Sequence, residues 1–324
     1  MSSDIPASTL LFSVVIPTFN RAGLLAGAVE SLLQQAFDPL AFEIIVVDNG
    51  SSNETREMVE KLRAGSTKHT LHYLFVPEPG GGIARRAGAA SARGEWVAYM
   101  DDDARASPGW LQIAAEVLRE RRDLSGMGGP IHPFYLADRP AWFQDEYEIR
   151  TWGDAPRYLT RDEAFAGANM LFPRELLKKL GEAMPGFGMV GNMMHFGEDT
   201  ILFEQAWKLL GQAKFYYHPG LLMYHAVPAR NMDTGYILRR QFSIGASNFR
   251  RTGPRAFFRR VLFILRHAGS LLRLATRMVL RRGKFARREN WLVEYGGPVA
   301  KKIGLLSAAL GLNIRFRQRQ EDAP

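Results

Sequence analysis

The first hundred residues alternate between short apolar runs and segments whose apolar residues recur at helical spacing. The runs are "FSVVIP" (12–17), "FEIIVV" (42–47), "LHYLFV" (71–76) and "EWVAYM" (95–100). Each is short and mostly apolar, which predicts a strand that is buried on both faces. Helical segments separate the runs, such as 20–36 with Leu25, Val29 and Leu32 on one face. This order predicts an α/β fold whose Rossmann-like, mostly parallel central sheet is covered by helices on both faces.

Polar residues gather where three of these strands end. They are Pro17, Thr18 and Arg21 after the first strand, Asp48 and Asn49 after the second, and Asp101, Asp102 and Asp103 after the fourth. Parallel strands end at one edge of a sheet, and their ligands bind in the crevice outside that edge. We therefore expect these side chains to share one ligand site.

Three consecutive aspartates, at 101–103, follow the fourth strand. Like charges this close disfavour one another unless a cation lies among them. Carboxylates at a strand end suit Mg²⁺ or Mn²⁺, which prefer oxygen ligands and take further ligands from water and substrate phosphates. The alternative is structural: a solvated turn, or the start of a helix near Ser107 with Pro108 in its first turn.

For two further segments, the sequence allows either a role in ligand binding or a purely structural role. Asp48 and Asn49 can contact a nucleobase or a ribose, or Asn49 can form an Asx turn that caps the next helix. The glycine-rich segment "GGGIARRAG" (80–88) predicts a loop that leads into a helix, but it matches neither the GxGxxG nor the GxxxxGK[ST] pattern. Arg85 in this segment either approaches an anionic ligand or is solvated.

The second half of the chain supplies three more candidates. Glu198 and Asp199 open a predicted helix, where they either complement the helix dipole or include a general base. His225 ends an apolar run, and a lone histidine is usually structural, but beside aspartates it becomes a candidate metal ligand.

The segments around these candidates are less regular. Residues 126–165 are rich in glycine, proline and aromatics, which predicts a long excursion that shapes a substrate cleft. A strand and a helix are expected at 165–181, and a pair of strands at 213–227.

Positive charge is concentrated near the end of the chain. The formal net charge is +9, yet residues 250–324 hold 18 basic and 4 acidic residues, and the remainder holds 24 basic and 29 acidic residues. This asymmetry predicts an α/β domain at 1–249 and a basic helical region at 250–324.

Arginines alternate with apolar residues at 255–280, the pattern of a helix that lies in a membrane interface beside anionic lipids. The alternative is a helical pair packed on the α/β domain with a solvated arginine face. No nucleic-acid-binding module is recognisable and the α/β domain is net acidic, so we expect no nucleic acid partner.

Composition narrows the compartment and the chemistry. The chain has no cysteine, which excludes disulfides, thiolate metal sites and a cysteine nucleophile, and which fits a reducing compartment. The first residues lack a basic, then apolar, leader, and no uninterrupted apolar stretch reaches the ~18 residues of a spanning helix. We therefore expect a cytoplasmic protein, peripheral on the inner face of the cell membrane.

Five segments together resemble the inverting family 2 glycosyltransferases of the GT-A fold. In chain order they are "SVVIPTFNR", "FEIIVVDNGSSNET", "ARGEWVAYMDDDA", "FAGANMLFPRELLKKLG" and "GEDTILFEQAWKLLG". The resemblance covers roughly residues 12–245, and its specificity lies in the ordered set. It implies a nucleotide-diphosphate sugar donor, a divalent cation (Mn²⁺ or Mg²⁺) and a saccharide or lipid-linked acceptor.

The family pattern implies roles for individual residues. Around the nucleotide it places Pro17, Thr18 and Arg21 at the first strand end, Asp48 and Asn49 at the base and ribose, and Arg85 ahead of the small-residue helix. It implies that Asp101 or Asp102 contacts the sugar and ribose, that Asp103 holds the metal, and that Asp199 is the catalytic base with Glu198 beside it. It places Gly167 and Asn169 near the donor sugar or acceptor, and His225 and Arg230 near the metal and diphosphate.

The resemblance implies metal-dependent, inverting sugar transfer in polysaccharide or glycolipid biosynthesis. One alternative is a catalytically inactive protein that binds nucleotide sugars as a scaffold. Another is a nucleotidyltransferase, although that class needs a glycine- and lysine-bearing loop where this chain has "PTFNRAG".

Overall fold

The predicted apolar strands form the centre of an eight-stranded sheet. The computed structural model describes residues 10–52, 54–181 and 198–316. In spatial order the strands are β3 (Thr70–Phe75), β2 (Phe42–Asp48), β1 (Phe12–Thr18), β4 (Trp96–Tyr99), β9 (Met170–Pro173), β6 (Gly126–Gly128), β10 (Phe215–Tyr217) and β8 (Arg157–Tyr158). Only β9, between β4 and β6, and β8, at the edge, run antiparallel to their neighbours. The predicted α/β fold with a mostly parallel sheet is confirmed.

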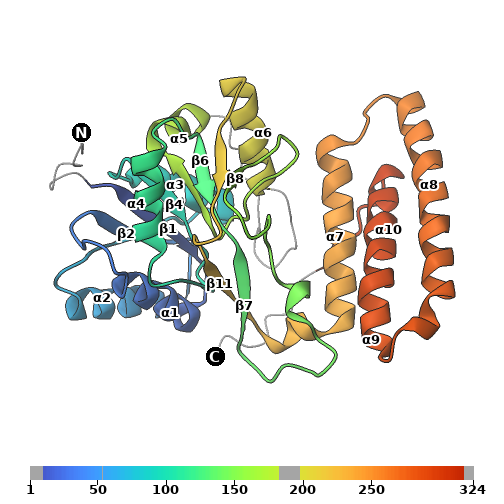
Figure 1. Ribbon diagram of the computed structural model, residues 1–324, viewed down its shortest axis with the longest axis horizontal. Helices are drawn as coiled ribbons and strands as arrows, with labels where there is room; N and C mark the ends of the chain where they lie inside the picture. Colours follow the sequence, from blue (N-terminus) through green and yellow to red (C-terminus); the bar gives the residue numbers. More distant parts are fainter. Residues whose placement is uncertain (1–9, 53, 182–197, 317–324) are drawn as a thin grey trace.

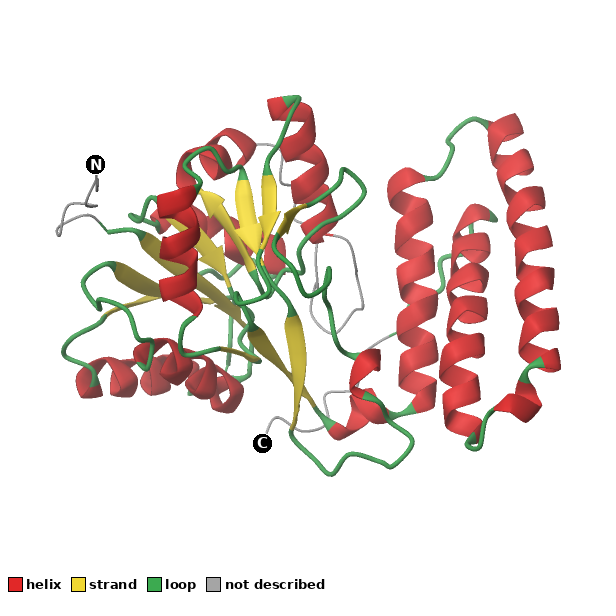
Figure 2. Ribbon diagram, viewed as in Figure 1, coloured by secondary structure: helices red, strands yellow, loops and turns green. Residues whose placement is uncertain are grey.

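Helices cover both faces of this sheet, as the buried strands require (Figure 2). They are α1 (Ala22–Leu33), α2 (Thr55–Gly65), α3 (Gly81–Ser91), α4 (Trp110–Glu120), α5 (Arg174–Leu180) and α6 (Glu198–Leu210). Val14 and Ile16 of β1 pack in a core with α1 and α4, whereas Val15 packs in a second core with α3, α5 and α6. The alternation along one strand thus divides the interior into two hydrophobic layers.

A second, three-stranded sheet brings distant segments to the end of β4. Its strands are β5 (Ala104–Ala106), β11 (Met223–Val227) and β7 (Ile131–Tyr135). β5 separates the aspartates from α4, so the aspartates do not open that helix. The excursion at 126–165 contributes β6, β7, β8 and the 3-10 helix η1 (Asp145–Tyr147). The strands expected at 213–227 are β10 and β11, but they join different sheets and do not pair with each other.

The chain ends in a layer of long helices beside the α/β part (Figure 1). Its elements are η3 (Ala229–Met232), α7 (Thr234–Thr252), α8 (Phe257–Leu280), η4 (Arg282–Lys284), α9 (Arg288–Trp291), the π-helical η5 (Leu292–Gly296) and α10 (Gly297–Ala309). α7 and α10 approach closely because of Gly245, where a Cβ would lie 1.8 Å from the Lys301 carbonyl oxygen. α7 runs across position 250, so the division into 1–249 and 250–324 stays a prediction. Within the described ranges, no helix combines the length and the apolar character that a membrane crossing requires.

Candidate nucleotide-sugar and metal site

The three polar strand ends meet at one edge of the sheet, as predicted. Thr18 at the end of β1 pairs in register with Asp48 at the end of β2. Beyond them, the Asn20 Oδ1 accepts a hydrogen bond from the Ser52 backbone N–H (2.8 Å), and the Asn20 N–H donates to the Ser51 Oγ (2.9 Å). Asn20 has a positive φ of 55°, a conformation that asparagine tolerates better than most residues. These bonds join the loops after β1 and β2, with half-buried Pro17 at their base.

Asp102 ties the end of β1 to the end of β4. Its carboxylate is 5% exposed and accepts hydrogen bonds from Thr18 Oγ1 (2.8 Å) and Arg21 Nη1 (3.1 Å). Burial raises the pKa of Asp102 to about 6, although the positive charge of Arg21 opposes this shift. Asp102 therefore holds Thr18 and Arg21 in place at the end of β1. Its contact with the sugar or ribose stays a prediction.

Asp103 lies between two positive groups. His225 Nε2 is 3.1 Å from Asp103 Oδ1, and Arg21 Nη1 is 3.0 Å from Oδ2. The pairing of β5 with β11 sets this contact, because it places His225 opposite Ala104 and lets the Ala226 N–H donate to the Asp103 carbonyl (2.8 Å). Burial alone would raise the pKa of Asp103, but His225 and Arg21 hold it well below its usual range.

The contact with Asp103 also shifts the pKa of His225. Burial alone would lower its pKa, but the charge of Asp103 and its hydrogen bond raise the pKa of His225 to about 9. His225 and Asp103 therefore attract each other, and a cation that takes His225 as a ligand must displace the proton of the imidazole.

Asp101, Asp103 and His225 form a group that fits a divalent cation. One ligand atom from each of the three lies within 4.8 Å of the others. Two carboxylates and an imidazole form a donor set that suits Mn²⁺ and other divalent ions. Arg85 Nη2 also lies 2.8 Å from Asp101 Oδ1, so Asp101 has a positive partner as well. The structure thus adds Asp101 to the metal candidates Asp103 and His225, whereas the family pattern placed it on the sugar or ribose.

Asp48 and Asn49 have structural partners at the second strand end. Asp48 accepts from the Tyr73 hydroxyl (2.6 Å) and from the Ser51 N–H (2.8 Å). The Asn49 amide donates to the carbonyls of Val76 (3.1 Å) and Glu78 (2.5 Å), and its Oδ1 accepts from the Gly80 N–H. Asn49 therefore shapes the loop after β3 and does not cap α2. Contacts of Asp48 and Asn49 with a base or ribose stay predictions.

Asn169 lies in the protein interior. Its Oδ1 accepts from the Trp110 indole N–H (3.0 Å), and its amide donates to the carbonyls of Pro130 (3.0 Å) and Leu221 (2.6 Å). With 0% exposure and its polar atoms already bonded, this side chain holds the two sheets together, and its expected contact with a sugar has no support from its position. Gly167 is also buried, two residues earlier.

Two further groups of candidates are placed only in part. Arg230 lies in η3, which follows the strand that carries His225. α6 begins at Glu198, but the side chains of Glu198 and Asp199 lie outside the described residues, so their role as catalytic groups is untested.

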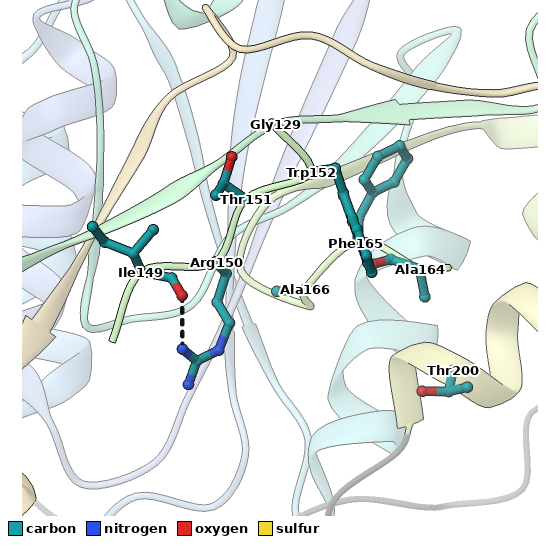
Figure 3. A pocket seen from close by; sticks show the side chains of 9 residues that line it. All are labelled: Gly129, Ile149, Arg150, Thr151, Trp152, Ala164, Phe165, Ala166 and Thr200. Carbon is teal, nitrogen blue, oxygen red and sulfur yellow. Dashed lines mark hydrogen bonds between the residues drawn. The ribbon is translucent and has the colours of Figure 1, made fainter. Parts of the chain in front are cut away.

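A pocket of about 300 Å³ opens between the excursion and the start of α6 (Figure 3). Its lining residues are Gly129, Ile149, Arg150, Thr151, Trp152, Ala164, Phe165, Ala166 and Thr200. Among these lining residues, Thr200 comes from α6 and follows Asp199 directly in the sequence. The sequence predicted that the aromatic-rich excursion shapes a cleft, but it did not single out Trp152, Phe165 or Arg150.

An ion pair between Arg157 and Glu163 supports this pocket wall. Arg157 makes two hydrogen bonds to the Glu163 carboxylate (2.9 and 2.6 Å), and its Nε donates to the Trp152 carbonyl (3.2 Å). The bond from Arg157 lowers the pKa of Glu163 to about 2. Because the folded pKa lies below the unfolded value of 4.5, the pair stabilises the fold above pH ~4.5, and this contribution is lost as the pH falls toward about 2.

We expect Glu163→Gln to have a lower free energy of unfolding than the wild type at pH 7. The difference between the two should shrink as the pH falls from ~4.5 toward about 2. Urea titrations at a series of pH values measure it, with Glu60→Gln at an exposed helical pair as the control. A difference that is constant between pH 7 and the acid limit would contradict the assignment.

Comparison with known proteins decides the family. The model of the glycosyl transferase family 2 matches residues 13–181, slightly more than half of the chain. The chain belongs to glycosyltransferase family 2. The predicted family is confirmed, and the match contradicts the nucleotidyltransferase alternative.

Relatives of this family 2 member differ in how much of the chain they share. The succinoglycan biosynthesis protein ExoM of Rhizobium meliloti is 26% identical over 320 residues, which cover 95% of each chain. A glucosyl-dolichyl phosphate glucuronosyltransferase of Haloferax volcanii is 26% identical over 177 residues. The chain spans about half the length of that second relative (54%) and smaller shares of several others.

Two solved structures share the fold. The mannosyltransferase PcManGT from Pyrobaculum calidifontis, in complex with GDP-Man and Mn²⁺, aligns with a TM-score of 0.60 and 19% identity, and covers 94% of this chain and 87% of its own. Residues 1–349 of TarS from S. aureus, in complex with UDP-GlcNAc, align with a TM-score of 0.54 and 18% identity, covering 93% and 92%. The expected GT-A architecture is confirmed.

Proposed function

We propose that this family 2 chain transfers a sugar from a nucleotide-diphosphate sugar to an acceptor hydroxyl, with inversion, in the biosynthesis of a polysaccharide or glycolipid. The observation that supports it best is the group of Asp101, Asp103 and His225, which lies beyond the end of β4, at the edge of the sheet where β1 and β2 also end. The relatives agree in kind: ExoM is a succinoglycan biosynthesis protein, and the fold neighbours were solved with GDP-Man or UDP-GlcNAc.

The acidic cluster would hold a divalent cation, Mn²⁺ or Mg²⁺, through Asp101, Asp103 and His225. Such a cation, when bound, offsets the negative charge that develops on the diphosphate leaving group. Arg21 forms an ion pair with Asp103, and Arg85 forms one with Asp101, so each of these carboxylates also has a positive partner.

Asp199 would act as the general base in this proposal. It removes the proton from the acceptor hydroxyl, whose oxygen attacks the anomeric carbon while the bond to the diphosphate oxygen breaks. One displacement inverts the configuration, so no side chain has to form a covalent intermediate. The pocket beside Thr200 would hold the acceptor, with Trp152 in its wall.

A thermal-shift screen tests the proposal. We expect one nucleotide-diphosphate sugar, in the presence of Mn²⁺ or Mg²⁺, to raise the melting temperature, because a ligand at a hundred times its Kd adds about 2.7 kcal/mol to stability. A chelator should remove most of the shift. If no nucleotide sugar shifts the transition with either metal, the proposal is wrong. A shift without any transfer or donor hydrolysis would instead support the scaffold alternative.

A further inference from the structure

Helix α8 has an inner face that packs and an outer face that does not. Phe263 and Ile264 pack against a buried cluster of α7 and α10, and the Phe263 ring lies 5.4 Å from that of Phe249. Arg260 Nε donates to the Ala309 carbonyl (2.5 Å), which also joins α8 to α10. α10 and α7 lie between α8 and the α/β part, so the side of α8 opposite to α7 and α10 faces away from the α/β part (Figure 1).

The outer face of α8 is apolar and exposed. Its large apolar side chains are between 37% and 83% exposed: Phe257, Phe258, Val261, Leu262, Leu265, Leu272, Val279 and Leu280. Their spacings of three, four and seven place them on one side of the helix. The helix has 24 residues and is therefore ~36 Å long. The exposed apolar side chains form a row along it, whereas an ordinary protein surface carries such residues singly.

A row of arginines runs beside the apolar row. Arg259, Arg266, Arg273 and Arg277 are separated by seven, seven and four residues, so they share a second side of the helix. α8 contains no aspartate or glutamate. The helix therefore presents a long apolar stripe with a cationic edge and no acidic group of its own.

We propose that the outer face of α8 binds an anionic lipid bilayer, lying in the plane of its interface. A helix with an apolar stripe buries it at the boundary between headgroups and acyl chains, and its basic edge attracts anionic headgroups. A second copy of this chain fits less well, because the same face of α8 offers the arginines no carboxylate. This surface is distinct from the nucleotide-sugar site, and its binding does not require transfer activity.

Vesicle flotation of the full chain tests the proposal. We expect the wild type to float with mixed phosphatidylcholine–phosphatidylglycerol vesicles and far less with phosphatidylcholine alone. Leu262→Glu with Leu265→Glu should abolish flotation. Arg266→Gln with Arg273→Gln should weaken it about fivefold per arginine, since one basic residue near an anionic surface contributes ~1 kcal/mol.

Leu40→Glu is the matched control. Leu40 is 73% exposed, more than Leu262 (51%) and Leu265 (64%), but it lies in the loop before β2, so this variant should float like the wild type. Unchanged far-UV circular dichroism and melting temperature show that each variant is folded.

Three outcomes would overturn the proposal. The first is a wild type that stays at the bottom of the gradient with anionic vesicles. The second is a pair of folded α8 variants that float like the wild type. The third is a wild-type dimer, measured by light scattering, that the leucine variant dissociates without any flotation, which would show that a second copy covers this face.

Discussion

Replacing Asp199 with asparagine is expected to lower the rate of sugar transfer by about two to four orders of magnitude, the typical contribution of a general base. An amide cannot accept the acceptor's proton, so the attacking oxygen stays a neutral hydroxyl. Asp199 is the second residue of α6, and Thr200, which follows it in the sequence, lines the pocket proposed for the acceptor. Single-turnover transfer assays measure the rate.

The same variant should bind the donor as well as the wild type does, because the base contacts the acceptor. Thermal shifts with the nucleotide sugar measure this separately. Glu198→Gln is the matched control, since it removes the neighbouring charge from the same helical turn, and we expect a much smaller loss. If Glu198→Gln loses the activity and Asp199→Asn keeps it, Glu198 is the general base and Asp199 is not. If both keep it, neither is the base.

The central sheet could be predicted because its strands are encoded locally. β1 and β2 are mostly apolar and are covered on both faces. Strands of this composition are typical of a parallel sheet with helices on both sides. The helices between them follow from spacing in the same way. Such elements need only their own residues to be recognised.

The glycine-rich segment contains the helix that was predicted there, but the helix begins earlier than the pattern indicated. The triple glycine favoured a loop, yet α3 already begins at Gly81. Its Gly88 explains part of the composition, because a Cβ there would lie 2.3 Å from Val15 Cγ1 and 3.0 Å from Val47 Cγ2. Small residues let this helix approach the sheet closely, and that requirement comes from tertiary packing.

The small sheet could not be predicted, since its strands have three to five residues and their partners are far apart in the chain. The contact between His225 and Asp103 depends on this sheet. The residue types suggested a metal site, and the family pattern suggested the same two residues. Only the pairing of β5 with β11 explains why they meet.

The roles of polar residues near the crevice were harder to predict, because the same side chains can either bind a ligand or bond to the protein's own backbone. Asn49 and Asn169 are both amides beside the predicted site. The structure shows that each bonds to backbone carbonyls and to one N–H donor. Buried amides need such partners, and the sequence does not show where those partners lie.

Replacing Asp103 with asparagine is expected to lower transfer by at least about a hundredfold, since even the outer partners of metal ligands typically contribute 10–100-fold. Unlike Asp199→Asn, this change should also weaken the thermal shift given by the nucleotide sugar with Mn²⁺. The amide keeps the shape of the side chain but removes the charge that His225 and Arg21 contact. Transfer assays and metal titrations at one pH measure both effects.

Asp123→Asn is the control for the loss of an aspartate. Asp123 pairs with Lys214 and precedes β6, at the amino end of the parallel strands and thus at the opposite edge of the sheet from the site. It should retain both transfer and metal-dependent donor binding. If Asp103→Asn binds metal and donor like this control, the cation does not bind at Asp103. If it loses transfer but not metal binding, Asp103 acts on the donor directly and Asp101 with His225 holds the ion.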